Sequence, residues 1–143
     1  MYQITEGRAL AGALTVQKDL AGQSLDVLDA TFTIGAEAAN AITVAIQLLD
    51  GNGREITWRA AVDFYLSDDA NGDSITATGP GVSITADPDG VYQPFIAVKA
   101  GRLISEADGD IDFKIGETGG ATWYLVLILP GGKLKVSGAI TFA

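Results

Sequence analysis

The chain has 143 residues, of which 48% are hydrophobic, 19% are charged and 18 are glycine. This composition is too apolar for a disordered chain and suits one domain of short strands joined by tight turns. The formal net charge of −9 argues against nucleic acid and anionic membranes as partners, and the lack of cysteine and histidine excludes disulfides, thiol catalysis and thiolate or imidazole metal sites.

The sequence also lacks the features of a membrane or secreted protein. No run approaches the roughly 18 consecutive apolar residues of a membrane-spanning helix. Residues 1–6 do not combine a basic start with an apolar block, as a secretion signal does. We therefore expect a soluble protein made in a cytoplasm, with neither a membrane nor nucleic acid as partner.

The first 26 residues differ from the rest of the chain. Their leucines are separated by glycines and by small or polar residues, with neither the period of a helix nor that of a strand. We predict that residues 1–26 form an extended N-terminal arm and that residues 27–143 form the folded domain. Leu10, Leu14 and Leu20 of the arm are candidate contacts with a partner.

Alternation of apolar with polar or small residues, typical of half-buried β-strands, begins near residue 29. It covers residues 31–34, 42–48 and 56–66. The turn sequence at residues 50–53, Asp-Gly-Asn-Gly, predicts a β-hairpin closed at that point.

The middle of the chain is less regular. Ile75, Val82 and Ile84 indicate short strands interrupted by proline and glycine, and residues 91–98 indicate a further strand that contains Pro94. Proline cannot donate a hydrogen bond to a neighbouring strand, so it is confined to edge strands and bulges. We expect edge strands in this region.

The last third of the chain carries the clearest pattern. Residues 110–115 alternate, the run 122–129 is apolar on both faces, and after Pro130-Gly131-Gly132 residues 133–142 alternate as one further strand. A strand that is apolar on both faces must be covered on both sides. Tyr124, Val126 and Ile128 form the second of these faces, and we expect another subunit or the arm to cover this stripe.

About nine short strands with turn signals at regular spacing predict an all-β protein. Their apolar faces are buried when two sheets pack together. We predict an antiparallel β-sandwich that is immunoglobulin-like, with a jelly-roll as the alternative. The expected core residues are Ile46, Phe64, Phe113, Leu125, Leu127 and Val136.

The acidic turn at residues 69–73 is a weak candidate for calcium. Asp69, Asn71 and Asp73 present oxygen ligands on alternate residues, as hard cations prefer. However, Ser74 stands where an EF-hand loop needs glycine, and Pro80 stands where its bidentate glutamate belongs. An ordinary turn is the favoured interpretation.

Four carboxylates alternate over residues 106–112, which on a strand would place them along one face as a cluster that could serve paired acid–base catalysis or bind a cation. Ile111 and Phe113 explain the same alternation as the outer face of a half-buried strand, which is the favoured interpretation. Since no histidine is present to activate a serine, we predict a protein that is not an enzyme and needs no cofactor or metal.

Residues 41–53, 62–69 and 105–113 resemble immunoglobulin-like β-sandwiches of bacterial and phage surface proteins. Residues 64–73 and 121–137 are similar to segments of tailed-bacteriophage head decoration, or cement, proteins. The resemblance implies a non-catalytic virion protein that binds the major capsid protein on the capsid exterior as a homotrimer or homodimer. Before assembly it would reside in the host cytoplasm.

An alternative function remains open at this point. An immunoglobulin-like module of a fibre or adhesin that recognises a host surface glycan would share the same strand pattern.

Overall fold

The computed structural model describes residues 26–143. The predicted arm, with Leu10, Leu14 and Leu20, lies outside these residues except for its last residue. The described chain forms ten strands and one short 3₁₀ turn: β1 (Asp29–Ile34), β2 (Ala41–Leu49), β3 (Ala61–Ser67), β4 (Ser83–Ala86), β5 (Val91–Ile96), β6 (Ala100–Ile104), β7 (Asp110–Gly116), β8 (Ala121–Ile128), η1 (Pro130–Gly132), β9 (Leu134–Val136) and β10 (Ile140–Phe142). Within residues 26–143, no helix is long and apolar enough to cross a membrane.

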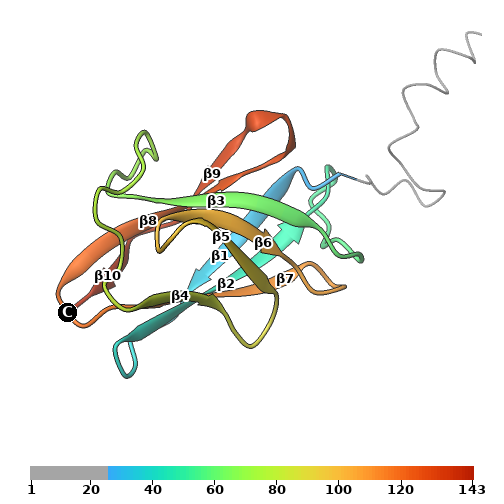
Figure 1. The fold of residues 1–143 in the computed structure, drawn as a ribbon. Coiled ribbons are helices and arrows are strands. Elements are labelled where there is room, and N and C mark those ends of the chain that lie inside the picture. The colour runs from blue at the N-terminus through green and yellow to red at the C-terminus, as the bar shows by residue number, and fades with distance from the viewer. Residues whose placement is uncertain (1–25) are drawn as a thin grey trace, which may run out of the picture.

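The strands form two antiparallel sheets that pack against each other as the layers of a sandwich (Figure 1). The first sheet has the order β1-β2-β7-β4, and the second has the order β10-β8-β3-β6-β5, with β9 also paired to β8. The prediction of an antiparallel β-sandwich is confirmed.

The strand order follows the immunoglobulin pattern. The central strands β2 and β7 of the first sheet correspond to strands B and E of an immunoglobulin domain, and β3 and β8 correspond to strands C and F. The hairpin β5–β6 extends the second sheet beyond β3. The chain enters this hairpin from β4, so the hairpin runs from the edge of the sheet inwards.

The core lies between the two sheets. Four apolar residues of β2 alternate inwards and are at most 2% exposed: Ile42, Val44, Ile46 and Leu48. The rings of Phe64 and Phe113 meet across the sandwich, edge to face, with their centroids 5.0 Å apart. Five of the predicted core residues are buried: Ile46, Phe64, Phe113, Leu125 and Leu127.

The sixth predicted core residue, Val136, is only half-buried, because residues 134–142 do not form one continuous strand. Val136 pairs with Val126 on β8, whereas Ile140 pairs with Trp123. The β9–β10 segment therefore has one more residue between these two pairs than β8 has. The extra residue forms a β-bulge around Ser137, and after such a bulge the side chains of the strand point to the opposite face of the sheet. As a result Val136 points outwards and Ile140 inwards.

The predicted hairpin at residues 50–53 is also wrong. The turn exists, and Leu49 forms an isolated bridge with Glu55, but β2 and β3 belong to different sheets. The chain crosses from one sheet to the other after this turn, with Ile56 fully buried on the way. Alternation in the sequence identifies which residues point inwards, but it does not identify which strands pair.

The predicted edge strands are found where expected. β4 is an edge strand of the first sheet, and β5 is an edge strand of the second. The pairing of β5 with β6 shifts register between Pro94 and Ile96, as expected where proline lacks an N–H to donate.

The core assignment predicts unequal effects for the same substitution at two leucines. Leu127 is fully buried and Leu134 is 45% exposed. We expect Leu127→Ala to lower the free energy of unfolding by about 2–5 kcal/mol, and Leu134→Ala to change it by less than about 0.5 kcal/mol. Urea denaturation followed by circular dichroism measures both. Equal effects of the two substitutions would contradict the assignment of inner and outer faces.

Candidate functional site

The acidic turn predicted as a weak calcium candidate is held by its own hydrogen bonds. Asp69 Oδ1 accepts a hydrogen bond from the Asn71 N–H at 2.8 Å, and the Asp69 carbonyl accepts one from the Gly72 N–H at 2.9 Å. Across residues 26–143, no group of three or more histidine, cysteine, aspartate or glutamate side chains is placed to hold a metal ion. Asp69 and Asn71 thus stabilise a turn, while Asp73 lies at the rim of a pocket described below.

Thr76 anchors this loop to the sandwich, a role that the sequence did not indicate. The side chain is 1% exposed, and its hydroxyl donates to Asp68 Oδ1 at 2.7 Å. Thr76 Oγ1 in turn accepts hydrogen bonds from Trp123 Nε1 and from the Gly79 N–H, each at 3.2 Å. Asp68 and Thr76 therefore tie the loop to the indole of β8.

The loop folds back over the outer side of the second sheet and covers Val126, which is 0% exposed. Gly72 lies so close that a Cβ atom there would be 3.0 Å from a methyl group of Val126 and 3.1 Å from one of Val136. Tyr65 Oη donates a hydrogen bond of 2.6 Å to the Gly72 carbonyl, which fixes the loop on this face.

The predicted stripe of Tyr124, Val126 and Ile128 is therefore not open along its whole length. Its centre, Val126, is covered within the chain itself; Tyr124 is half-buried, and Ile128 is 37% exposed. The sequence did not show that the 68–76 loop returns to the sheet, because nothing in the local pattern specifies a contact some fifty residues away.

The remaining surface of the second sheet that points away from the core is here called the outer face. The strand registers place two rows of outward residues across it: Leu134, Ile128, Asp63, Arg102 and Gln93 in one row, and Val136, Val126, Tyr65, Ala100 and Ile96 in the next. Six of the eight exposed large hydrophobic residues in the described chain lie on or beside this face: Ile75, Val91, Phe95, Ile96, Ile128 and Leu134. Exposed apolar surface is thus concentrated on one side of the molecule.

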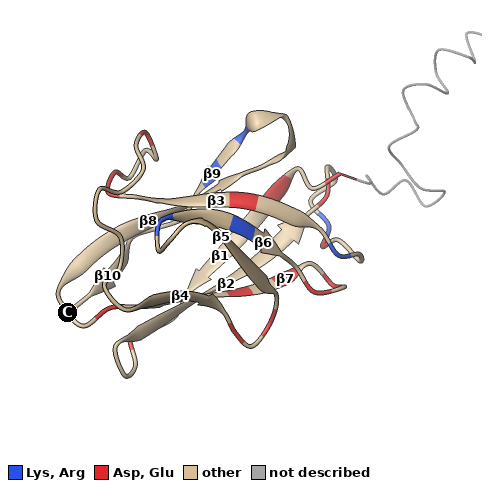
Figure 2. Cartoon of the chain, in the orientation of Figure 1, with Lys and Arg blue, Asp and Glu red and all other residues tan. Residues whose placement is uncertain are grey.

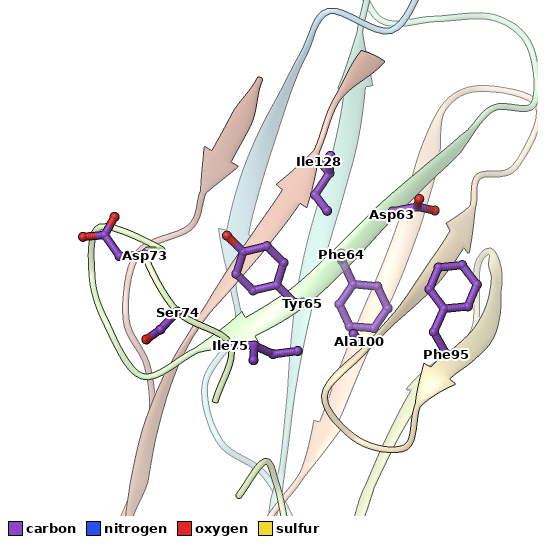
Figure 3. Close-up of a pocket in the computed structure, with 9 residues that line it drawn as sticks. All are labelled: Asp63, Phe64, Tyr65, Asp73, Ser74, Ile75, Phe95, Ala100 and Ile128. Atoms are coloured by element: carbon purple, nitrogen blue, oxygen red, sulfur yellow. The ribbon is translucent and has the colours of Figure 1, made fainter. Parts of the chain in front are cut away.

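A shallow pocket of about 270 Å³ opens in the middle of the outer face. Figure 3 shows Tyr65 and Ile75 on one side of it, Phe95 on the other and Ile128 beyond them. Asp63 and Asp73 supply the charged groups at its rim. Apolar walls with few polar groups suit the binding of an apolar group of a partner.

The outer face is almost neutral. Asp63 projects from β3 and Arg102 from the neighbouring strand β6, and the two form an ion pair of 2.8 Å. In Figure 2, β3 carries acidic colour and β6 carries basic colour at this part of the sheet. The Arg102 guanidinium also lies 5.6 Å from the centroid of the Phe95 ring. Lys135 of β9 is paired at 2.9 Å with Asp29 at the edge of the sandwich.

Of the four alternating carboxylates at residues 106–112, Asp110 and Asp112 lie on the opposite side of the sandwich, on β7 of the first sheet, and the other two lie before this strand. Burial raises the pKa of Asp112 above its usual value, and the carboxylates of Asp89 and Asp87 raise it further. Burial likewise raises the pKa of Asp110, with additional contributions from Asp112, Asp89 and Asp108.

Glu106 belongs to a different set of contacts. It accepts a hydrogen bond from the Gly90 N–H at 3.2 Å and pairs with Arg59 at 3.1 Å. The four carboxylates of residues 106–112 therefore do not form one site.

The similarity of this chain to known proteins is low. No family model and no curated protein matches it. Among solved structures, the chain is similar to a cohesin module from a family 33 glycoside hydrolase of Clostridium perfringens, with 12% sequence identity, 82% of this chain and 94% of that chain covered, and a TM-score of 0.36. Similarity at this level gives no information on function. The class that the structure itself defines is that of antiparallel β-sandwich proteins.

The covered position of Val126 predicts the effect of a charge at that site. We expect Val126→Asp to lower the free energy of unfolding by about 3–5 kcal/mol, because the carboxylate has no ionic partner under the loop. Ile128→Asp is the matched control on the same strand and face, and it should have a much smaller effect because Ile128 is 37% exposed. Urea denaturation compares the two. A well-folded, equally stable Val126→Asp variant would show that the loop does not cover this residue in solution.

The raised pKa of Asp112 predicts that removal of this carboxylate stabilises the fold, by an amount that depends on pH. Because the folded-state pKa of Asp112 lies above its ordinary value of 3.8, ionisation destabilises the fold at neutral pH, and the penalty disappears once the pH falls below that ordinary value. We expect Asp112→Asn to raise the melting temperature at pH 7, with a gain that shrinks as the pH is lowered towards 3.8. Asp73→Asn, on the other side of the sandwich, is the control. A gain independent of pH would mean that the effect is not electrostatic.

Proposed function

We propose that this protein is a structural component of a tailed-bacteriophage virion, a head decoration or cement protein that binds the outer capsid surface and stabilises the head. The observation that carries the proposal concerns the two segments that resemble decoration proteins, residues 64–73 and 121–137. In the fold they meet: the loop after β3 is seated on β8 and β9 through Gly72, and Thr76 just beyond the segment bonds Trp123. The resemblance therefore falls on one continuous part of the structure and not on scattered turns.

The physical properties of the domain are compatible with this role. A decoration protein needs a rigid, small unit that is present in many copies and adheres through protein–protein contacts. The sandwich offers an apolar, nearly neutral outer face for such contacts. The net charge of −9 favours solubility of the free subunits before assembly.

In this proposal the N-terminal arm attaches the subunit to the major capsid protein, with Leu10, Leu14 and Leu20 supplying apolar contacts. The arm up to residue 25 contains two acidic and two basic residues, Glu6, Asp19, Arg8 and Lys18, so this stretch carries no net side-chain charge of its own. An arm of this composition approaches an acidic or a basic shell equally well.

A second candidate function is a fibre or adhesin module that binds a host glycan. It is favoured by the exposed ring of Phe95 beside the Asp63–Arg102 pair, since sugar sites combine an aromatic surface with polar groups. Sedimentation of the purified protein with capsids that lack it, compared with binding to a glycan array, separates the two functions. Binding to glycans without binding to capsids would overturn the proposed function.

The proposed attachment predicts the effect of removing the arm. We expect deletion of residues 2–24 to abolish co-sedimentation with capsids. The melting temperature should stay within a few degrees of that of the full chain, a change of less than about 1 kcal/mol in stability, because β1 begins only at Asp29.

Two variants of the undeleted chain test whether the leucines of the arm, and not only the presence of an arm, contribute to capsid binding. Replacing Leu10, Leu14 and Leu20 together with alanine should weaken capsid binding, whereas replacing Gln3, Gln17 and Gln23 with alanine should not. A truncated protein that still decorates capsids at full occupancy would remove the arm from the attachment mechanism.

A further inference from the structure

The two sides of the sandwich differ in how they would meet a second copy of this chain. The outer side of the first sheet carries Asp110 and Asp112 of β7, next to Asp87 and Asp89. Lys114 of β7 pairs with Asp87 at 3.1 Å, and the remaining carboxylates still make this side acidic, so two copies meeting there would bring like charges together. The strands of the second sheet have Asp63 and Arg102 as their outward charges, and these neutralise each other. Asp73 of the 68–76 loop adds one carboxylate at the rim of the pocket. Of the two sheets in the described chain, the second is therefore the one on which repulsion between two acidic subunits opposes contact least.

The arrangement of Asp63 and Arg102 also makes the outer face complementary to itself. The two residues are direct neighbours across β3 and β6. A rotation of 180° about an axis that lies in the interface, parallel to the strands and between β3 and β6, exchanges their positions. Asp63 of each copy then faces Arg102 of the other, which is the reciprocal pairing that a two-fold dimer requires.

The same rotation brings apolar groups together on both sides of the charged pair. By the strand registers, Ile128 of one copy comes to lie over Gln93 of β5 in the other, close to Phe95, which is 59% exposed, while Leu134 on β9 lies one strand further out. The pocket beside Phe95 then faces apolar side chains of the second copy. An apolar surface with its charges paired has the composition of a protein–protein contact.

We infer that the outer face of the second sheet is a dimer interface, on which a second copy of this chain packs face to face about a two-fold axis parallel to the strands, between β3 and β6. Five strands spaced about 4.8 Å apart give a face about 19 Å wide. This width places the contact at the small end of specific interfaces, so the dimer dissociates on dilution. Many copies held on one surface would favour it by raising the local concentration.

The inference deepens the self-association within the proposed function, and the purified protein alone tests it. Capsid binding does not enter the measurement, so failure of the proposed function and failure of the dimer are separate results. Sedimentation velocity over a range of concentrations should show a monomer–dimer equilibrium for the full chain.

The decisive experiment uses two charge reversals, alone and mixed. Asp63→Arg places two positive charges on each copy, and Arg102→Asp places two negative charges there, so each variant alone should dimerise at least about tenfold more weakly than the native chain. Mixed in equal amounts, the two variants should form a heterodimer at least as tight as the native dimer. Both variants lose the Asp63–Arg102 pair within the chain. If that pair acted only within one chain, mixing the two variants would not restore dimerisation.

A second pair of variants tests the apolar part of the interface. Ile128→Asp should abolish the dimer, whereas Val82→Asp, at a residue that is 57% exposed just before β4 on the first sheet, should leave it unchanged. Melting curves confirm that each variant is folded.

Four results would overturn the inference. They are a native chain that stays monomeric at about 1 mM, a mixture of the charge variants that stays monomeric, a trimer in place of the dimer, and a monomeric full chain that dimerises only after deletion of residues 2–24. The last result would mean that the arm covers the outer face.

Discussion

The double-sided burial of β8 is the constraint on which the rest of the structure depends. Its inward residues, from Trp123 to Leu127, fill the core between the sheets, while Val126 on the opposite side is fully buried as well. The first sheet covers only the inner side of β8, so another element must cover its outer side. The loop between β3 and β4 supplies this cover, and its residues suit the close approach. Gly72 contacts the valine methyl groups with a φ of 74° that few other residues adopt, and Thr76 replaces the solvent partner of the Trp123 N–H.

The same loop shapes the candidate interaction surface. The loop covers Val126 but does not extend over Ile128. Ile75, near the end of the loop, forms one wall of the pocket opposite Phe95. The apolar character of the outer face is thus partly a consequence of how far the loop reaches. Asp68 is engaged with Thr76 and Asp69 with the turn itself, so these two carboxylates hold the shape of the loop, whereas Asp73 lies at the rim of the pocket.

The sequence predicted the strands well because a two-residue period reports directly which side chains point inwards. It did so for Ile46, Phe64 and Phe113, and for the edge position of Pro94. It failed wherever the outcome depended on a contact between distant segments. The turn at residues 50–53 has the same composition whether the chain pairs back or crosses to the other sheet. A single extra residue near Ser137 places Val136 and Ile140 on opposite faces of the sheet, although they share one face in the simple alternation.

The two sides of the sandwich differ in charge. Acidic residues gather in the turns and along β7, where burial and crowding raise the pKa of Asp110 and Asp112, whereas the second sheet presents a neutral apolar surface. A chain of this kind that associates through one sheet keeps its acidic side towards solvent, because turning that side inwards would cost the desolvation of several carboxylates. This distribution of charge disfavours contact of the acidic side with a second acidic chain or with an anionic surface, and it leaves the outer face as the side on which charge opposes contact least.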